Sequence, residues 1–192
     1  MNIVHLSTTP LAGSPYNIST VLDKYTKHTS RHILYRPIRL CTGNFSEILL
    51  KTKRFQKLFS VDRWFDQHDI EEYLSPANKL SRYGSTSVVL RFTFDEILNY
   101  TPKSYFDFIY IDAHAHTEQD NGQILSDWFP KLKDGDVFSG HDYEEIQWPK
   151  TFDAVNSFAA KHKLSIKEVS GDRNSQNSQD QWKSWYTIKN SA

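Results

Sequence analysis

Short apolar runs alternate along the whole chain with segments in which apolar side chains recur every three or four positions. A continuous or alternating apolar run is typical of a β-strand, whereas recurrence at every third or fourth position is typical of one face of a helix. We predict strands at Asn2–Ser7, His32–Leu40, Lys57–Val61, Ser87–Leu90, Phe106–Ile111, Val137–Ser139, Leu164–Val169 and Trp182–Ile188. We predict helices at Ile18–Tyr25, Phe45–Leu50, Ile70–Tyr83, Phe94–Tyr100, Gln123–Leu132 and Phe152–His162. The alternation favours an α/β fold, a Rossmann-like three-layer sandwich whose sheet is mostly parallel and has an antiparallel C-terminal strand.

The run at Phe106–Ile111 is the most apolar in the chain, which is typical of a central parallel strand that is covered on both faces. Helical crossovers make the strands of such a sheet point the same way, and ligands bind outside their carboxyl ends. Candidate functional residues are therefore the polar ones that directly follow a predicted strand.

The composition of the chain restricts the range of functions and partners that it can have. The 192 residues fit one domain, and Lys+Arg and Asp+Glu both number 23, so the net charge is zero. Nucleic acid is not expected as a partner, because proteins that bind it carry a basic excess. Cys41 cannot form a disulfide framework alone, and neither a signal peptide nor an apolar run of roughly 20 residues is visible. We predict a cytoplasmic protein that acts on a small-molecule substrate without a membrane, and homo-oligomer formation is left open.

Asp62 ends the second strand of the unit that opens with the loop at residues 41–44. It lies about 20 residues after that loop, where a carboxylate can accept both hydroxyls of a nucleotide ribose. The alternative is an ordinary turn aspartate.

Acidic and imidazole side chains also follow two later strands. Asp112, His114 and His116 come after Phe106–Ile111, and the dipeptide at 141–142 comes after the next strand and Gly140. A carboxylate at the end of a buried strand must be solvated, paired or bound to a cation, because burying it alone is costly. Oxygen and nitrogen ligands from two neighbouring strands suit Mg, Mn, Fe or Zn. The alternative is a set of solvated loop residues, which is the interpretation preferred for His116.

Two sequence runs carry a family resemblance. The run YFDFIYIDAH at 105–114 and the run WFPKLKDGDVFSGHDY at 128–143 resemble the second half of class I S-adenosylmethionine-dependent methyltransferases. The group most similar is the small-molecule O-methyltransferase-like family with an IDGxHxY run followed by GHDY. TGNFSE at 42–47 is similar to its glycine-rich first loop, and FSVDRW at 59–64 to its ribose-binding strand. The resemblance covers about residues 40–188 and is most specific at 105–143.

This resemblance implies S-adenosylmethionine-dependent O-methylation of a small hydroxylated metabolite or sugar, with Mg or Mn assisting. The implied cofactor-binding residues are Thr42, Gly43 beneath the methionine part, Asn44, Asp62 on the ribose, Thr93 near the adenine, and Asp112. The implied metal ligands are Asp112, Asp142 and His141. The implied catalytic residues are His114 as general base, Asp112 and His141.

The first loop departs from the family pattern. Arg39 and Leu40 stand where the family has residues that are small or acidic and let the cofactor approach the backbone. A cationic Arg39 also disfavours a nearby sulfonium. The alternative function is therefore a catalytically inactive, methyltransferase-like binding module.

Two further resemblances concern parts of the chain. Residues 5–19 resemble the opening βα unit of two-domain glycosyltransferases, so we predict an N-terminal appendage at 1–36 and a methyltransferase-like domain at 37–192. IDAHAH at 111–116 resembles the metal-binding motif of barrel-fold amidohydrolases. That motif belongs on the first strand of a barrel of roughly 250 residues, whereas here only 76 residues (192 − 116) follow it.

Overall fold

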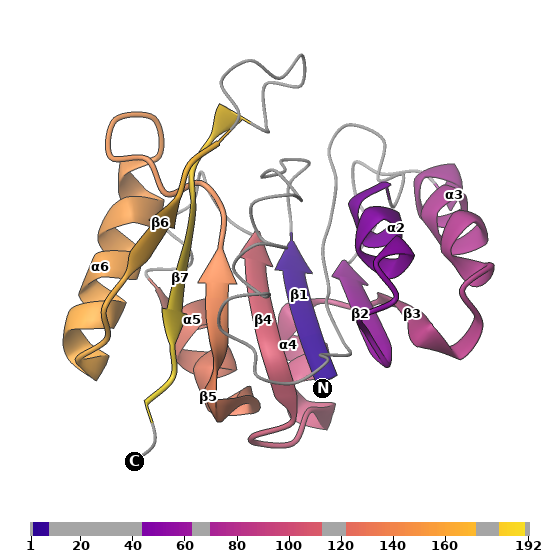
Figure 1. Ribbon diagram of the computed structural model, residues 1–192, viewed down its shortest axis with the longest axis horizontal. Coiled ribbons are helices and arrows are strands. Elements are labelled where there is room, and N and C mark those ends of the chain that lie inside the picture. The colour runs from indigo at the N-terminus through magenta and orange to yellow at the C-terminus, as the bar shows by residue number, and fades with distance from the viewer. Residues whose placement is uncertain (1, 8–43, 63–69, 113–121, 172–180, 191–192) are drawn as a thin grey trace.

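The computed structural model describes residues 2–7, 44–62, 70–112, 122–171 and 181–190. Within them, a seven-stranded sheet has the order β3-β2-β1-β4-β5-β7-β6 (Figure 1). Its strands are β1 (Asn2–Ser7), β2 (Lys57–Asp62), β3 (Ser87–Arg91), β4 (Phe106–Asp112), β5 (Leu132–Gly140), β6 (Lys167–Val169) and β7 (Ser184–Ile188). Strands β1 to β5 pair in parallel, whereas β7 runs antiparallel to both β5 and β6. The predicted mostly parallel sheet with an antiparallel C-terminal strand is confirmed.

Helices cover both faces of this sheet. Figure 1 shows α2 and α3 on one side and α4, α5 and α6 on the other, which gives the three predicted layers. The helices are α2 (Asn44–Lys51), α3 (Ile70–Ser81), α4 (Phe94–Tyr100), α5 (Gln123–Trp128) and α6 (Pro149–His162), and two short 3-10 turns are η1 (Gly84–Thr86) and η2 (Phe129–Lys131). None of the helices in the described ranges combines the length and the apolar character needed to cross a bilayer.

The first strand lies in the interior of the sheet. β1 pairs with β2 on one side and with β4 on the other, so that Val4 lies opposite Phe59 and Ile109. The described part of the N-terminal segment is therefore built into the same sheet as the rest of the chain. The predicted boundary between residues 36 and 37, the helix at 18–25 and the strand at 32–40 all lie outside the described residues.

The prediction of one helix over Gln123–Leu132 is wrong at its C-terminal end. α5 ends at Trp128, η2 follows, and Leu132 already pairs with Phe106 of β4. Pro130 explains the change, because proline has no amide hydrogen to continue an α-helical ladder.

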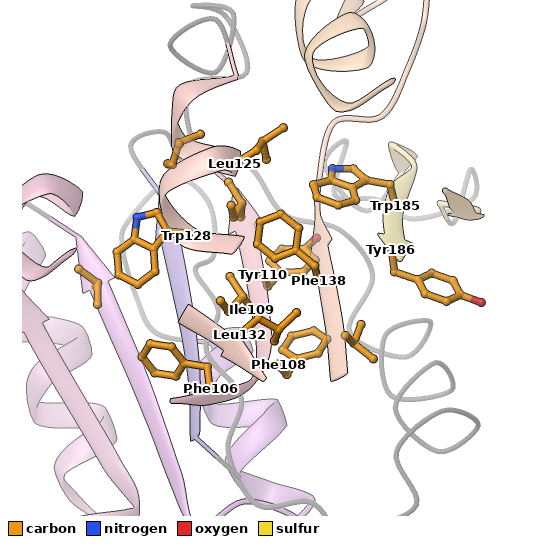
Figure 2. Close-up of a cluster of buried hydrophobic side chains, with 14 of the residues drawn as sticks. Phe106, Phe108, Ile109, Tyr110, Leu125, Trp128, Leu132, Phe138, Trp185 and Tyr186 are labelled. Atoms are coloured by element: carbon orange, nitrogen blue, oxygen red, sulfur yellow. The ribbon is translucent and has the colours of Figure 1, made fainter. Parts of the chain in front are cut away.

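The core is densest around β4. Phe108, Ile109 and Tyr110 are each at most 1% exposed, and Figure 2 shows their side chains gathered with those of α5, β5 and β7. The rings of Phe138 and Trp185 meet edge to face with centroids 5.5 Å apart. Side chains packed on both faces explain why the sequence of β4 is almost continuously apolar.

A bulge in β5 brings two carboxylates together at the amino end of β4. The register jumps from Phe106↔Leu132 to Phe108↔Val137, so Asp107 and Asp136 each directly precede a residue of the pair Phe108↔Val137. Lys133 Nζ lies 2.8 Å from Asp107 Oδ1. Burial, and then the charge of Asp107, raise the pKa of Asp136 to about 7, although Lys133 acts in the opposite direction.

Asp136→Asn is expected to stabilise the protein above pH 7 and to flatten its stability between about pH 4 and 7. The folded protein holds the Asp136 proton more tightly than the unfolded chain, so the free energy of unfolding falls as pH rises through this window. Because the side chain is partly solvated, we expect a gain of about 1–2 kcal/mol at pH 8. Urea unfolding at pH 5 and pH 8 measures it. Asp153→Asn, an exposed change on α6, serves as control, and equal pH slopes for Asp136→Asn and the wild type would contradict the prediction.

Candidate functional site

Four predicted site residues lie at the carboxyl ends of parallel strands, all at one edge of the sheet. Asp62 is the last residue of β2, and Asp112 is the last residue of β4. Thr93 lies two residues after β3, and Asp142 lies two residues after β5. Asp62 is 2% exposed and Asp112 is 1% exposed. Two buried carboxylates thus lie at the edge where ligands of such sheets bind.

Asp112, His141 and Asp142 form the closest group of candidate ligands in the described residues. One ligand atom from each lies within 4.8 Å of the other two. His141 Nδ1 is 2.8 Å from Asp142 Oδ1 and 3.8 Å from Asp112 Oδ1. All three residues are only 1% exposed, so one imidazole nitrogen faces two buried carboxylates.

The backbone of β5 holds this group against β4. The amide of His141 donates to the carbonyl oxygen of Ile111 at 3.0 Å, which continues the β4–β5 pairing beyond the last strand residue. Asp142 then adopts a φ of 56°, in the left-handed region that aspartate tolerates better than most residues. This turn keeps Asp142 beside its neighbour His141 instead of on the opposite face, where strand alternation would place it.

Tyr143 anchors the turn, although sequence analysis did not select it as a site residue. Its hydroxyl donates to Asn156 Oδ1 at 2.9 Å, and its amide donates to the Lys183 carbonyl oxygen at 3.0 Å. The ring packs against Phe152 with centroids 4.7 Å apart. Burial raises the pKa of the Tyr143 hydroxyl. The tyrosine that ends the GHDY run was the available signal for this role.

The remaining predicted residues are placed less fully. Thr42, Gly43, His114 and His116 lie outside the described residues, as does Arg39, and Asn44 is the first residue of α2. Thr93 is the N-cap of α4, where its hydroxyl donates to Glu96 Oε2 at 2.8 Å and accepts from the Glu96 amide at 3.2 Å. Because the Thr93 amide also donates to Glu96 Oε2 at 2.7 Å and its carbonyl oxygen accepts from the Ile97 amide, contact with an adenine would come from the methyl group of Thr93.

The donor set fits a divalent cation. Carboxylates suit Mg and Mn, and an imidazole nitrogen among them shifts the preference from Mg toward Mn, Fe or Zn. Three converging ligands supply only part of a shell, so a bound cation would keep positions for water or substrate oxygens. The same edge thus has the elements to bind a ribose at Asp62 and hydroxyl groups near Asp112.

Comparison with known proteins agrees with this architecture. Residues 40–143 match a family model described as a methyltransferase domain, and no curated protein matches the sequence. The fold resembles the N-methyltransferase NodS from Bradyrhizobium japonicum, with a TM-score of 0.61 and 12% identity over 92% of this chain and 93% of that one. A putative O-methyltransferase from Klebsiella pneumoniae has a TM-score of 0.62 and 14% identity over 94% of this chain and 82% of that one. Spermidine synthase from Thermotoga maritima has a TM-score of 0.57 and 14% identity over 86% of this chain and 55% of that one.

Proposed function

Because the chain belongs to the methyltransferase-domain family, we propose that it binds S-adenosylmethionine at the carboxyl edge of the sheet and methylates a hydroxyl of a small metabolite or sugar. The observation that carries the proposal is the pair of buried carboxylates, Asp62 and Asp112, at the ends of parallel strands on that edge. The structural neighbour NodS has been crystallised with S-adenosyl-L-homocysteine, which supports a cofactor of this class.

Asp62 is the residue best suited to hold the ribose. The residue is only 2% exposed, and its carboxylate can accept charge-assisted hydrogen bonds from two vicinal hydroxyls. Asp112, on β4 and separated from β2 only by β1, would border the other side of the cofactor. When bound, S-adenosylmethionine supplies an electrophilic methyl group.

The chain's own residues then have two tasks, to orient the acceptor hydroxyl and to receive its proton. Asp112 and Asp142 both present a carboxylate oxygen to Nδ1 of His141, at 3.8 Å and 2.8 Å, so the two acids and the imidazole are close enough to act on one acceptor. General acid–base catalysis requires a side chain within reach that takes the proton of the acceptor hydroxyl. His114, two residues after Asp112, is the proposed base.

A divalent cation belongs to the same proposal. Asp112, His141 and Asp142 would hold it, and we propose Mn because one of the three ligands is an imidazole. A cation bound there would supply Lewis-acid assistance to the acceptor hydroxyl. The burial of all three ligands supports this role, since a bound cation offsets the cost of holding two carboxylates out of water.

Asp62→Ala is expected to weaken S-adenosylhomocysteine binding about ten- to hundredfold. Loss of charge-assisted hydrogen bonds typically costs about 1.5–3 kcal/mol, which corresponds to that range in affinity. Isothermal titration calorimetry measures the change, with Asp153→Ala on α6 as a matched surface control. Wild-type protein that gives no binding heat at millimolar ligand would refute cofactor binding and favour the inactive binding module. Equal affinities of Asp62→Ala and the wild type would refute the ribose role of Asp62.

A further inference from the structure

Two tryptophans from distant parts of the chain meet beside the proposed site. Trp148 ends the turn that follows β5 and is the N-cap of α6, and Trp182 lies two residues before β7. Their ring centroids are 6.2 Å apart with an interplanar angle of 84°, an edge-to-face pair. Both residues are half-buried.

Backbone hydrogen bonds limit how far this pair can lie from Asp142. The Tyr143 amide donates to the Lys183 carbonyl oxygen at 3.0 Å, which puts Trp182 one residue from the hydrogen-bond partner of Tyr143. The Trp148 amide donates to the Glu144 carbonyl oxygen at 2.9 Å, which folds the turn back on itself. Since consecutive Cα atoms are 3.8 Å apart, the Cα atoms of Trp182 and Asp142 lie within roughly 13 Å of each other.

The turn that carries Trp148 has an exposed isoleucine and two acidic residues. Ile146, in the same turn, is 95% exposed. Glu144 and Glu145 precede it, and Glu144 Oε1 accepts from the Lys183 amide at 3.4 Å. The Lys183 ammonium is 2.9 Å from Glu168 Oε2, so a carboxylate already offsets its charge. An exposed isoleucine and two half-buried indoles offer apolar surface to a ligand, and these acids disfavour an anionic ligand.

On the basis of the proposed function, we infer that Trp148, Trp182 and Ile146 form the acceptor-binding wall and that the acceptor is an uncharged, hydroxylated ring. A flat apolar ring face packs against indole, while its hydroxyls reach the Asp112–His141–Asp142 group. The aliphatic side chain of Ile146 adds apolar area that suits a ring better than a small organic cation. A hydroxylated ring can come from a sugar or from a phenol, and this surface would accept the face of either.

The test uses four probes in the presence of S-adenosylhomocysteine: methyl β-glucopyranoside, catechol, glucose 6-phosphate and choline. We expect saturable binding of at least one of the two uncharged rings, measured by ligand-observed NMR, and the ring that binds identifies the source. Trp148→Ala and Trp182→Ala should each weaken that binding about tenfold, while Trp148→Phe stays within about threefold of the wild type. Tyr100→Ala, an 80% exposed aromatic at the end of α4, is the matched control and should bind like the wild type.

Several outcomes would overturn the acceptor wall. They are no ring binding to the wild type, tighter binding of glucose 6-phosphate or choline than of either ring, and full ring affinity in both tryptophan-to-alanine variants. S-adenosylhomocysteine affinity is measured on every variant. Absence of S-adenosylhomocysteine binding to the wild type would refute the proposed function. Normal cofactor affinity together with unchanged ring binding in the tryptophan variants would refute only the acceptor wall. Thermal unfolding within a few degrees of the wild type shows that the variants are folded.

Discussion

Gly140→Ala is expected to lower the free energy of unfolding by about 3 kcal/mol or more, at the upper end of the cost of overpacking a core. A Cβ atom at this position would lie 2.5 Å from the Ile111 carbonyl oxygen and 2.7 Å from Trp185 Nε1. Neither neighbour can move cheaply. Ile111 belongs to β4 and accepts the His141 amide, and Trp185 is 2% exposed and packed against Phe138. Urea unfolding followed by circular dichroism measures the loss.

Gly135→Ala separates this steric effect from backbone strain. Gly135 has a φ of 83°, but nothing lies within 4 Å of the Cβ position, so only the unfavourable backbone conformation opposes alanine. We expect a cost of about 1 kcal/mol there. If the two alanine variants unfold with equal free energies, Trp185 does not approach Gly140 as closely as the structure shows. Because His141 follows Gly140, a displaced strand end should also weaken binding at the proposed site.

The position of Asp62 and Asp112 at one edge of the sheet was predictable from sequence, because the carboxyl ends of parallel strands all lie at the same edge. The continuous apolar run before Asp112 marks a strand covered on both faces, and the shorter run before Asp62 marks a second. Strands joined by helical crossovers point the same way, so both carboxylates had to lie at one edge. Asp62 and Asp112 do end β2 and β4, which both run parallel to the β1 strand between them.

The bulge in β5 could not be predicted from the residues around it in the sequence. The Asp134-Gly135 pair has the chemistry of a turn, yet β5 runs through it as a bulge, because Gly135 donates to the Lys189 carbonyl oxygen at 2.7 Å. The Asp136 carbonyl oxygen in turn accepts the Lys189 amide at 3.0 Å. These partners lie more than 50 residues away, so no pattern within a short window could reveal them.

The contact between two tryptophans could not be predicted for the same reason, because the residues that meet are far apart in the sequence. Trp148 and Trp182 are 34 residues apart, and each alone is an ordinary half-buried aromatic. Only the antiparallel return of β7 beside β5 brings them together. The left-handed φ of Asp142 could not be predicted from the sequence either, although this backbone turn is what places Asp142 beside His141.

Asp112→Asn and Asp142→Asn are each expected to abolish the rise in melting temperature that Mn²⁺ produces in the wild type. A cation at a hundredfold excess over its Kd adds about 2.7 kcal/mol to stability, or about 5–10 °C for a domain of this size. Each substitution keeps the shape of the side chain but removes one of the two charges beside His141, which lies 2.8 Å from Asp142 and 3.8 Å from Asp112. Differential scanning fluorimetry across a Mn²⁺ titration measures the response.

Asp153→Asn on α6 is the control for this experiment, because its exposed carboxylate lies outside the cluster and should leave the Mn²⁺ response intact. Far-UV circular dichroism without metal establishes that each variant is folded. If both site variants keep the full response, no shared cation site exists, and His141 and Asp142 serve to anchor the turn after β5. In that case proton transfer rests on His114 alone. If the response disappears in both folded variants but persists in the control, the two strand ends hold one cation between them, and Mn²⁺ should then accelerate methyl transfer to the ring acceptor.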